Sequence, residues 1–122
     1  MNETFRVAVE ADAGPVRMVL AGDVDVAALP ALRAALRSLF ERRPERIEID
    51  LGDVELVETV TAAFLAREQA AARALGTRVV LLRAQGVPSR LLAMAGAELE
   101  TGPEGDALSA PSSPGPSSPA LR

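Results

Sequence analysis

The sequence predicts an α/β fold in which one mixed sheet of four or five strands carries its helices largely on one face. Short apolar runs typical of strands interleave with stretches of helical periodicity, in the order β-β-α-β-α-β-α-(β). The β-α-β units imply parallel strand pairs with right-handed crossovers. With 122 residues, 48% of them hydrophobic, the chain can form one core but has too few strands for helices on both faces.

The first two strands are expected to form a hairpin. Residues Thr4 to Glu10 alternate between apolar and polar side chains, which indicates a strand with one buried face. The segment 12–15 is typical of a turn, and Val16 to Ala21 form the second strand. Gly22-Asp23-Val24-Asp25 then breaks the pattern and leads into a helix.

The first helix is expected to begin near Ala27 to Leu29, because Pro30 is tolerated only in the first turn of a helix. Pro44 should end it. Its apolar side chains fall on one stripe that we expect to face the core: Leu29, Leu32, Leu36, Leu39 and Phe40.

A third strand is predicted from Arg46 to Leu51, with alternate apolar residues on one face. A second helix follows from about Thr59 to Leu75, and Gly76 is placed to end it in a left-handed conformation. The apolar stripe expected to face the core on this helix comprises Val60, Phe64, Ala71 and Leu75, with Ala63 and Ala74 beside it.

The next strand spans Thr77 to Arg83, and its four consecutive apolar residues predict burial on both faces. A short helix from Val87 to Ala95 ends at Gly96, and residues 97–100 form a weak last strand. The Pro/Ser-rich stretch that follows cannot bury enough apolar area to offset its chain entropy. We therefore predict a domain at 1–100 and a disordered tail at 101–122.

The composition excludes several classes of function. The net charge of −4 disfavours binding to nucleic acid or to an anionic membrane surface. Without Cys or His, the chain lacks disulfides, a thiol nucleophile and the usual ligands of transition metals, so we expect no cofactor and no metal. No membrane-spanning apolar run or signal peptide is recognisable, which leads us to expect a cytoplasmic protein.

Two loops are candidates for function, because functional loops of α/β sheets lie at the carboxyl ends of strands. They are residues 22–25 and 55–61, and they are neighbours if their strands are parallel. Thr59 or Thr61 is either an N-cap or a phosphoacceptor at a helix N-terminus. Asp23, Asp25 and Glu58 are explained by capping and loop solvation better than by an enzyme or a Mg²⁺ site, because no nucleophile-and-base pair accompanies them.

At these loops the chain resembles the STAS domain family of bacterial anti-sigma factor antagonists. The family's Gly-Glu-Leu-Asp-like loop corresponds to Gly22-Asp23-Val24-Asp25. The family's Asp-Ser-Ser-Gly motif, which opens the second helix, corresponds to Glu58-Thr59-Val60-Thr61. Leu75-Gly76-Thr77 and the segment 87–96 resemble later family elements, so the resemblance covers about 5–100.

The resemblance implies a regulator of transcription that is not an enzyme. In such antagonists a serine/threonine kinase that is also the anti-sigma factor phosphorylates the first Ser of the motif. Thr59 is the matching phosphoacceptor candidate, and only Thr59 keeps the motif's chemistry. The implied partner-binding residues are Asp23, Asp25, Glu58, Thr59, Val60, Thr61 and Ala62.

Two departures leave alternatives open. Thr61 replaces the family's Gly, and the final helix common in such domains is nearly absent. Similar domains with altered loops are scaffolds in stress-signalling complexes or small subunits of lipid-transport ABC systems. A small carboxylate-based hydrolase is a remote further alternative.

Overall fold

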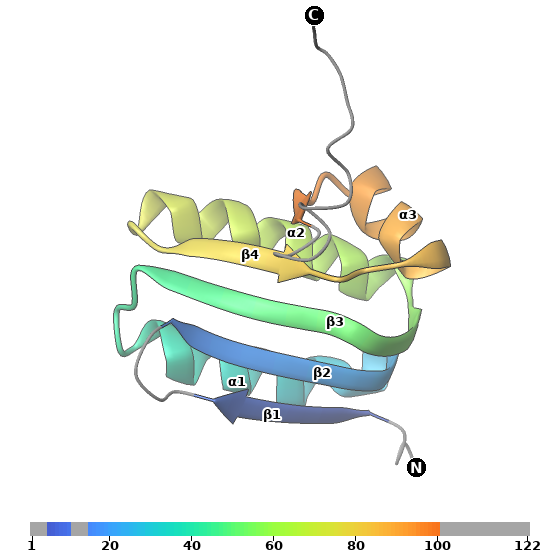
Figure 1. Ribbon diagram of the computed structural model, residues 1–122, viewed down its shortest axis with the longest axis horizontal. Helices are drawn as coiled ribbons and strands as arrows, with labels where there is room; N and C mark the ends of the chain where they lie inside the picture. Colours follow the sequence, from blue (N-terminus) through green and yellow to red (C-terminus); the bar gives the residue numbers. More distant parts are fainter. Residues whose placement is uncertain (1–4, 11–14, 101–122) are drawn as a thin grey trace, which may run out of the picture.

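The computed structural model describes residues 5–10 and 15–100, which form one five-stranded sheet and three α-helices (Figure 1). The strands are β1 (Arg6–Glu10), β2 (Val16–Val24), β3 (Arg46–Val57), β4 (Arg78–Leu82) and β5 (Leu99–Glu100). The helices are α1 (Leu29–Phe40), α2 (Thr59–Ala74) and α3 (Gly86–Met94), and a 3₁₀ turn, η1 (Val26–Ala28), precedes α1. The expected tail at 101–122 and most of the turn at 12–15 lie outside the described residues.

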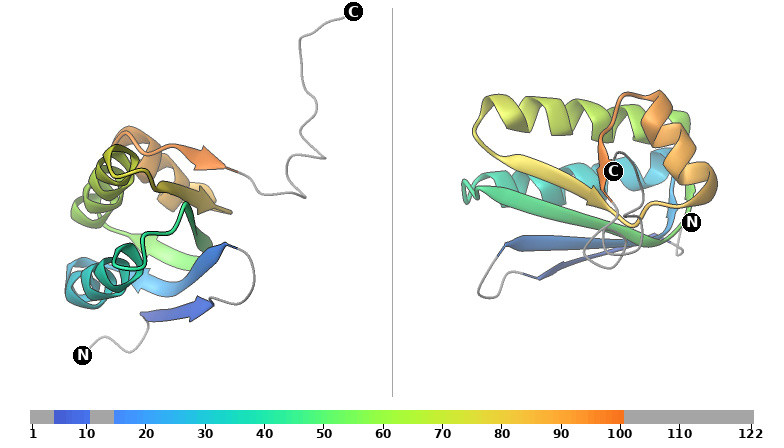
Figure 2. Two further views of the ribbon diagram at one scale, coloured as in Figure 1. Left: turned by 90° about the vertical axis from the view of Figure 1, so that its left-hand side faces the viewer. Right: turned by 45° about the horizontal axis from the view of Figure 1, so that its top comes forward.

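The strands lie in the sheet in their order along the chain, β1-β2-β3-β4-β5. β1 is antiparallel to β2, and every later pair is parallel. The three helices lie on one side of the sheet, as the left view of Figure 2 shows. The predicted fold class is therefore confirmed. Within the described part of the chain, no helix is long and apolar enough to cross a membrane.

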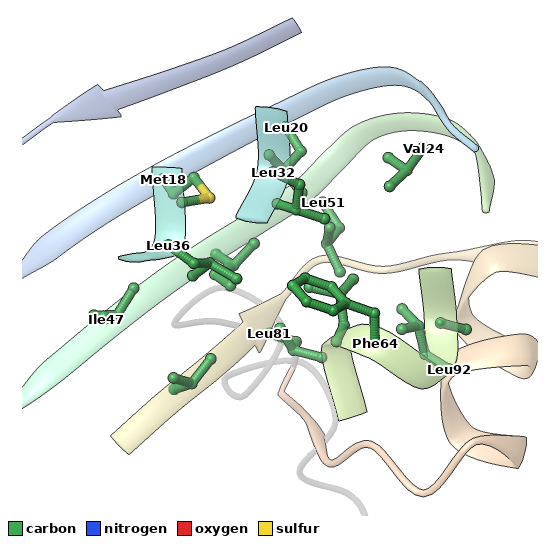
Figure 3. Packing of buried hydrophobic residues seen from close by; sticks show 14 of the residues in the cluster. Met18, Leu20, Val24, Leu32, Leu36, Ile47, Leu51, Phe64, Leu81 and Leu92 are labelled. Carbon is green, nitrogen blue, oxygen red and sulfur yellow. The ribbon is translucent and has the colours of Figure 1, made fainter. Parts of the chain in front are cut away.

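The core fills the space between this side of the sheet and the helices (Figure 3). Met18, Leu20 and Leu81 enter it from the sheet and are fully buried. Leu36 of α1 and Phe64 of α2 meet them from the helices, with 1% and 4% of their surfaces exposed. The predicted burial of β4 on both faces is also confirmed, because Val79, Val80, Leu81 and Leu82 are all buried.

Strands β2 and β3 are longer than the sequence predicted. Residues 22–24 belong to β2, and β3 continues beyond Leu51 to Val57. The pairing of the two strands shifts register between Val19 and Ala21 and again between Gly22 and Asp23. Gly22 has φ +85°, a conformation that Gly adopts at such irregularities without steric cost. The glycine expected to break the strand pattern therefore lies inside β2, beside a register shift between β2 and β3.

The start of α1 is confirmed, with Pro30 in its first turn, but its end is not. The helix stops at Phe40, ahead of Pro44, and Arg43 has a left-handed φ of +53°. The end of α2 agrees with the prediction. Gly76 has φ +86°, and the N–H groups of Gly76 and Thr77 donate to Arg73 and Ala72 carbonyls at 3.1 and 3.0 Å. This pattern is a Schellman motif.

The inward face of α2 differs from the predicted stripe. Of the four main stripe residues only Phe64 is buried, whereas Val60, Ala71 and Leu75 are exposed. The buried residues of the helix are instead Thr61, Ala62, Phe64, Leu65, Gln69 and Ala72. The helix is rich in alanine, so its apolar residues cover two faces, and hydrophobic periodicity alone could not select the correct one.

Gln69 lies on the inward face of α2 although its side chain is polar. Its Nε2 donates to the carbonyl oxygens of Val79 and Glu98 at 2.9 and 3.0 Å, and its Oε1 accepts from the Glu98 N–H at 2.8 Å. The amide therefore joins α2 to β4 and to the segment entering β5. Burial of a glutamine is tolerated because its polar atoms have partners.

On the side of the sheet away from the helices, Asp50 of β3 is buried, with 2% of its surface exposed. Its carboxylate accepts hydrogen bonds from the Arg17 guanidinium and from the backbone N–H of Gly52 at 2.9 Å. The Arg83 guanidinium donates to both carboxylate oxygens at 3.0 Å. A Cβ at Gly52 would lie only 2.6 Å from Nη2 of Arg83, so Gly52 leaves the space that this guanidinium occupies.

Burial and hydrogen bonding shift the pKa of Asp50 in opposite directions. Burial by itself raises the pKa, but the hydrogen bonds from Arg83, the Gly52 N–H and Arg17 outweigh it. The net result is a pKa below the ordinary value of 3.8. The ionised carboxylate therefore stabilises the folded state relative to the unfolded chain.

We expect Leu36→Ala to lower the free energy of unfolding by ~2–5 kcal/mol, because it leaves a cavity in the core. Phe64→Ala should cost a similar ~3–5 kcal/mol. The exposed Met94 provides the control, since Met94→Ala should change stability by less than ~0.5 kcal/mol. Urea unfolding followed by circular dichroism measures all three. A core variant that behaves like the control would contradict this description of the inward faces.

We expect Asp50→Asn to destabilise the protein at pH 7 and to lose this effect in acid. The folded-state pKa of Asp50 is below its unfolded value of 3.8, so its stabilising contribution is complete well above pH 3.8 and is lost as the pH falls through the folded-state pKa. The difference in Tm between wild type and variant should therefore shrink below pH 3.8. Asp53→Asn, which alters an exposed residue of the same strand, should leave the Tm at pH 7 close to that of the wild type. A pH-independent Tm difference for Asp50→Asn would contradict the ionic role.

Candidate functional site

The two loops predicted to carry function meet at one edge of the sheet. β2 and β3 are parallel and end side by side, with Val24 paired to Val57. Beyond this pair the backbone N–H of Glu58 donates to the Val24 carbonyl oxygen at 3.3 Å. The Glu58 carboxylate in turn accepts the backbone N–H of Val26 at 2.9 Å. The expected proximity of the loops is thus confirmed, and Glu58 connects them.

Thr61 fastens the start of α2 to the end of β2. It is fully buried, and its hydroxyl oxygen lies 2.7 Å from the Val24 carbonyl oxygen and 2.8 Å from that of Glu58. The same hydroxyl accepts the Glu58 backbone N–H at 3.1 Å. Together with the Glu58 side chain, which accepts the Thr61 N–H, this completes a capping box. The threonine at the family's Gly position therefore has a structural role in this chain.

The expectation that Thr59 or Thr61 is an N-cap is wrong, because the N-cap of α2 is Glu58. Thr59 is the first residue of the helix and is exposed. Thr61 is the third residue and points inward. The two hydroxyls thus occupy opposite environments, and only that of Thr59 is accessible from solvent. Ala62 is buried beside Thr61, with 1% of its surface exposed.

The acidic residues of the site are partly engaged in local structure. Asp25 is the N-cap of η1, and its side chain accepts the Ala28 N–H at 3.1 Å. Asp23 lies in β2, half-buried and paired with Leu56. Among the residues that the structure describes, no three acidic, His or Cys side chains form a group that could hold a metal ion.

Exposed apolar side chains add to this edge, and three of them, Val26, Leu56 and Val87, were not among the expected partner-binding residues. Together with the expected Val60, they keep between 43% and 58% of their surfaces exposed. They come from η1, the end of β3 and the first turns of α2 and α3, all of which lie where the parallel strands end. For Val26 and Leu56, an apolar residue inside an otherwise acidic loop is the signal that could have identified them. The edge therefore presents apolar and acidic groups together.

Comparison with known proteins adds a family and a set of structural neighbours. A family model described as "Mlab, STAS domain" matches residues 7–99. A comparison with curated protein sequences finds no significant match.

Among solved structures, an anti-sigma factor antagonist from Mycobacterium paratuberculosis is 27% identical, with a TM-score of 0.68, over 87% of this chain and 92% of that one. The anti-sigma factor antagonist SpoIIAA in its unphosphorylated form is 15% identical, with a TM-score of 0.66, over 85% and 92%. The Bacillus cell fate determinant SpoIIAA in its phosphorylated form is 18% identical, with a TM-score of 0.60, over 85% of this chain and 96% of that one. The two SpoIIAA structures show similarity of fold alone.

We expect Thr61→Val to destabilise the protein by ~1–3 kcal/mol, because it removes the hydroxyl that satisfies the buried start of α2. Thr59→Val is the matched control, since the same exchange at the exposed first residue should change stability by less than ~0.5 kcal/mol. Chemical unfolding of both variants measures the difference. Equal effects at the two positions would contradict the structural role of Thr61.

Proposed function

This chain belongs to the STAS domain family, and from that membership we propose that it is an anti-sigma factor antagonist that binds a kinase-type anti-sigma factor. The observation that carries the proposal is the edge described above. An accessible hydroxyl, Thr59, lies there at a helix N-terminus among exposed apolar and acidic side chains. The likeness to an anti-sigma factor antagonist at 27% identity over most of both chains supports it.

In this proposal Thr59 is the phosphoacceptor. Its hydroxyl is exposed at the first residue of α2, where helix N–H groups and the helix dipole favour an added phosphoryl group. A phosphate would bring a charge of roughly −2 beside Glu58 and the acidic loop that contains Asp23 and Asp25. Phosphorylation would thereby change the charge of the surface that binds the partner.

Of the seven residues expected to bind the partner, two are buried and cannot touch it. The other five can contact it directly: Asp23, Asp25, Glu58, Thr59 and Val60. Thr61 and Ala62 are buried, so in this proposal they position the surface without touching the partner. Val26, Leu56 and Val87 join the surface as exposed apolar residues. The resulting partner site has an apolar area beside acidic groups, which favours a partner that offers apolar and basic side chains.

The proposal includes the mode of action, the cellular location and the domain division of the protein. The protein would act by binding, without catalysing a reaction, and would regulate transcription from the cytoplasm. We retain the division into a domain at 1–100 and a disordered tail at 101–122 as part of the proposal. The extent of the family match, 7–99, supports this boundary.

A second candidate is a binding subunit without a phosphoswitch. Only Thr59 retains the chemistry of the family's Asp-Ser-Ser-Gly motif. In addition, the Thr61 hydroxyl is engaged in the capping box of α2. A scaffold that binds its partner permanently would need the exposed apolar edge but not an accessible hydroxyl.

The test is to identify the partner by affinity capture from native lysate and then to reconstitute the pair from purified proteins. With Mg²⁺ and ATP present, the intact mass of the wild type should increase by one phosphoryl group. Thr59→Ala should abolish this increase and preserve binding, because it removes the acceptor oxygen without adding charge. Thr59→Glu should weaken binding, since it places another carboxylate beside Glu58.

The other outcomes separate the alternatives. A partner that binds the wild type but never phosphorylates it would exclude the switch and support the permanent binding subunit. Labelling of Thr61 in place of Thr59 would show that the start of α2 opens during the reaction. Binding that is unaffected by Val60→Asp, at the centre of the apolar residues, would place the partner on a different surface.

A further inference from the structure

A groove of about 780 Å³ runs between α1 and α2, on the side of the helices that faces solvent. Arg33, Arg37 and Phe40 line it from α1, Phe64 and Arg67 line it from α2, and Leu75 lines it from the C-cap of α2. It ends near Pro44 and Gly76, at the edge of the sheet opposite the candidate site. None of the residues named for the candidate site lines this groove.

The accessible apolar side chains of the groove are Phe40, which is half-buried, and Leu75, which is 76% exposed. Phe64 lies beneath them as a core residue with 4% of its surface exposed. An isolated exposed leucine is ordinary on a protein surface, but here it lines the same groove as Phe40.

The walls of the groove carry cationic groups that lack anionic partners. In the parts of the chain that the structure describes, the side chains of Arg33, Arg37 and Arg67 form no ion pair. The Arg33 guanidinium lies 5.3 Å from the centroid of the Phe64 ring, as in a cation–π contact. In a chain of net charge −4, three such arginines around one groove form a local positive field.

The charge along the groove is uneven, which gives it a direction. Near Phe64 the three arginines face only Glu68, whereas the far end carries Glu41 and Glu45 with Arg43. The half nearer the start of the helices is therefore positive and the far end is slightly negative. A ligand of matching charge would bind in one orientation.

We propose that this groove binds an amphipathic helix of a partner protein, with apolar side chains on Phe40 and Leu75 and carboxylates beside Arg33, Arg37 and Arg67. A helix lying in a groove between two helices is a recurring mode of peptide recognition. The helical residues 33–40 span ~10 Å along the groove, which corresponds to about two turns of a bound helix. This second docking surface is independent of the proposed antagonist site.

The probe is a series of fluorescein-labelled peptides of about 14 residues, designed to be helical, with leucines at spacings of three and four and glutamates flanking them. In control peptides lysines replace the glutamates. Fluorescence anisotropy with the full chain should show saturable binding of at least one acidic peptide. Its affinity should exceed that of the matching lysine peptide by about tenfold or more.

Charge-reversal variants locate the peptide on the protein. Arg33→Glu combined with Arg37→Glu should weaken binding by about tenfold or more, whereas Arg90→Glu, on the exposed surface of α3, should leave it unchanged. Leu75→Asp should also weaken binding, and circular dichroism verifies that each variant is folded. Thr59→Glu should bind the acidic peptide as the wild type does, so this result does not depend on the antagonist proposal.

Three results would overturn the proposal: no binding by any acidic peptide, equal binding of the lysine peptides, or full binding by the Arg33/Arg37 charge-reversal variant. Sedimentation velocity addresses a different occupant. A dimer of the wild type that Leu75→Asp abolishes would show that the groove receives a second copy of the chain, which likewise overturns it.

Discussion

The arrangement of this molecule depends on right-handed crossovers that all advance in one direction across the sheet. Strands β2, β3, β4 and β5 are parallel neighbours in their order along the chain. Because a right-handed crossover places its helix on a side set by the direction of advance, α1, α2 and α3 must share one face. The carboxyl ends of the strands and the starts of the helices consequently lie at one edge, where the candidate site forms. The gap between α1 and α2 opens on the same face.

The same constraint leaves the other face of the sheet without helices from residues 5–10 and 15–100. Its central strand carries Asp50, which would be costly to bury alone. Arg17 from β2 and Arg83 from the end of β4 donate hydrogen bonds to this carboxylate, so it links three neighbouring strands across the face. The long aliphatic stems of arginine can also cover apolar side chains while the guanidinium stays near water. An ionic network thus occupies the place that a second helical layer has in doubly wound folds.

Local sequence signals predicted most of the fold but little of the site's hydrogen bonding. The four apolar residues of β4, the left-handed Gly76 and the inward Leu36 all follow from rules that act within a few residues. The inward turn of Thr61 depends on the carbonyl of Val24, 37 positions earlier, and the burial of Gln69 depends on Glu98, 29 positions later. No sequence pattern near Thr61 or Gln69 predicts these distant hydrogen-bond partners. The extension of β2 was not predicted for the same reason. Gly22 indicates a break in the strand, and only its pairing with Val54 of β3 keeps it within β2.

The capping box determines how a charge added at Thr59 would act. A phosphate at the start of a free helix could either stabilise it or displace its neighbours. Here Thr61 and Glu58 already fix the first turn of α2 to the end of β2 and to the start of η1. A group added at the exposed Thr59 would therefore leave the turn in place and alter the field beside the apolar residues of the edge. In the proposed function, the switch then works by repelling or releasing the partner from a rigid surface.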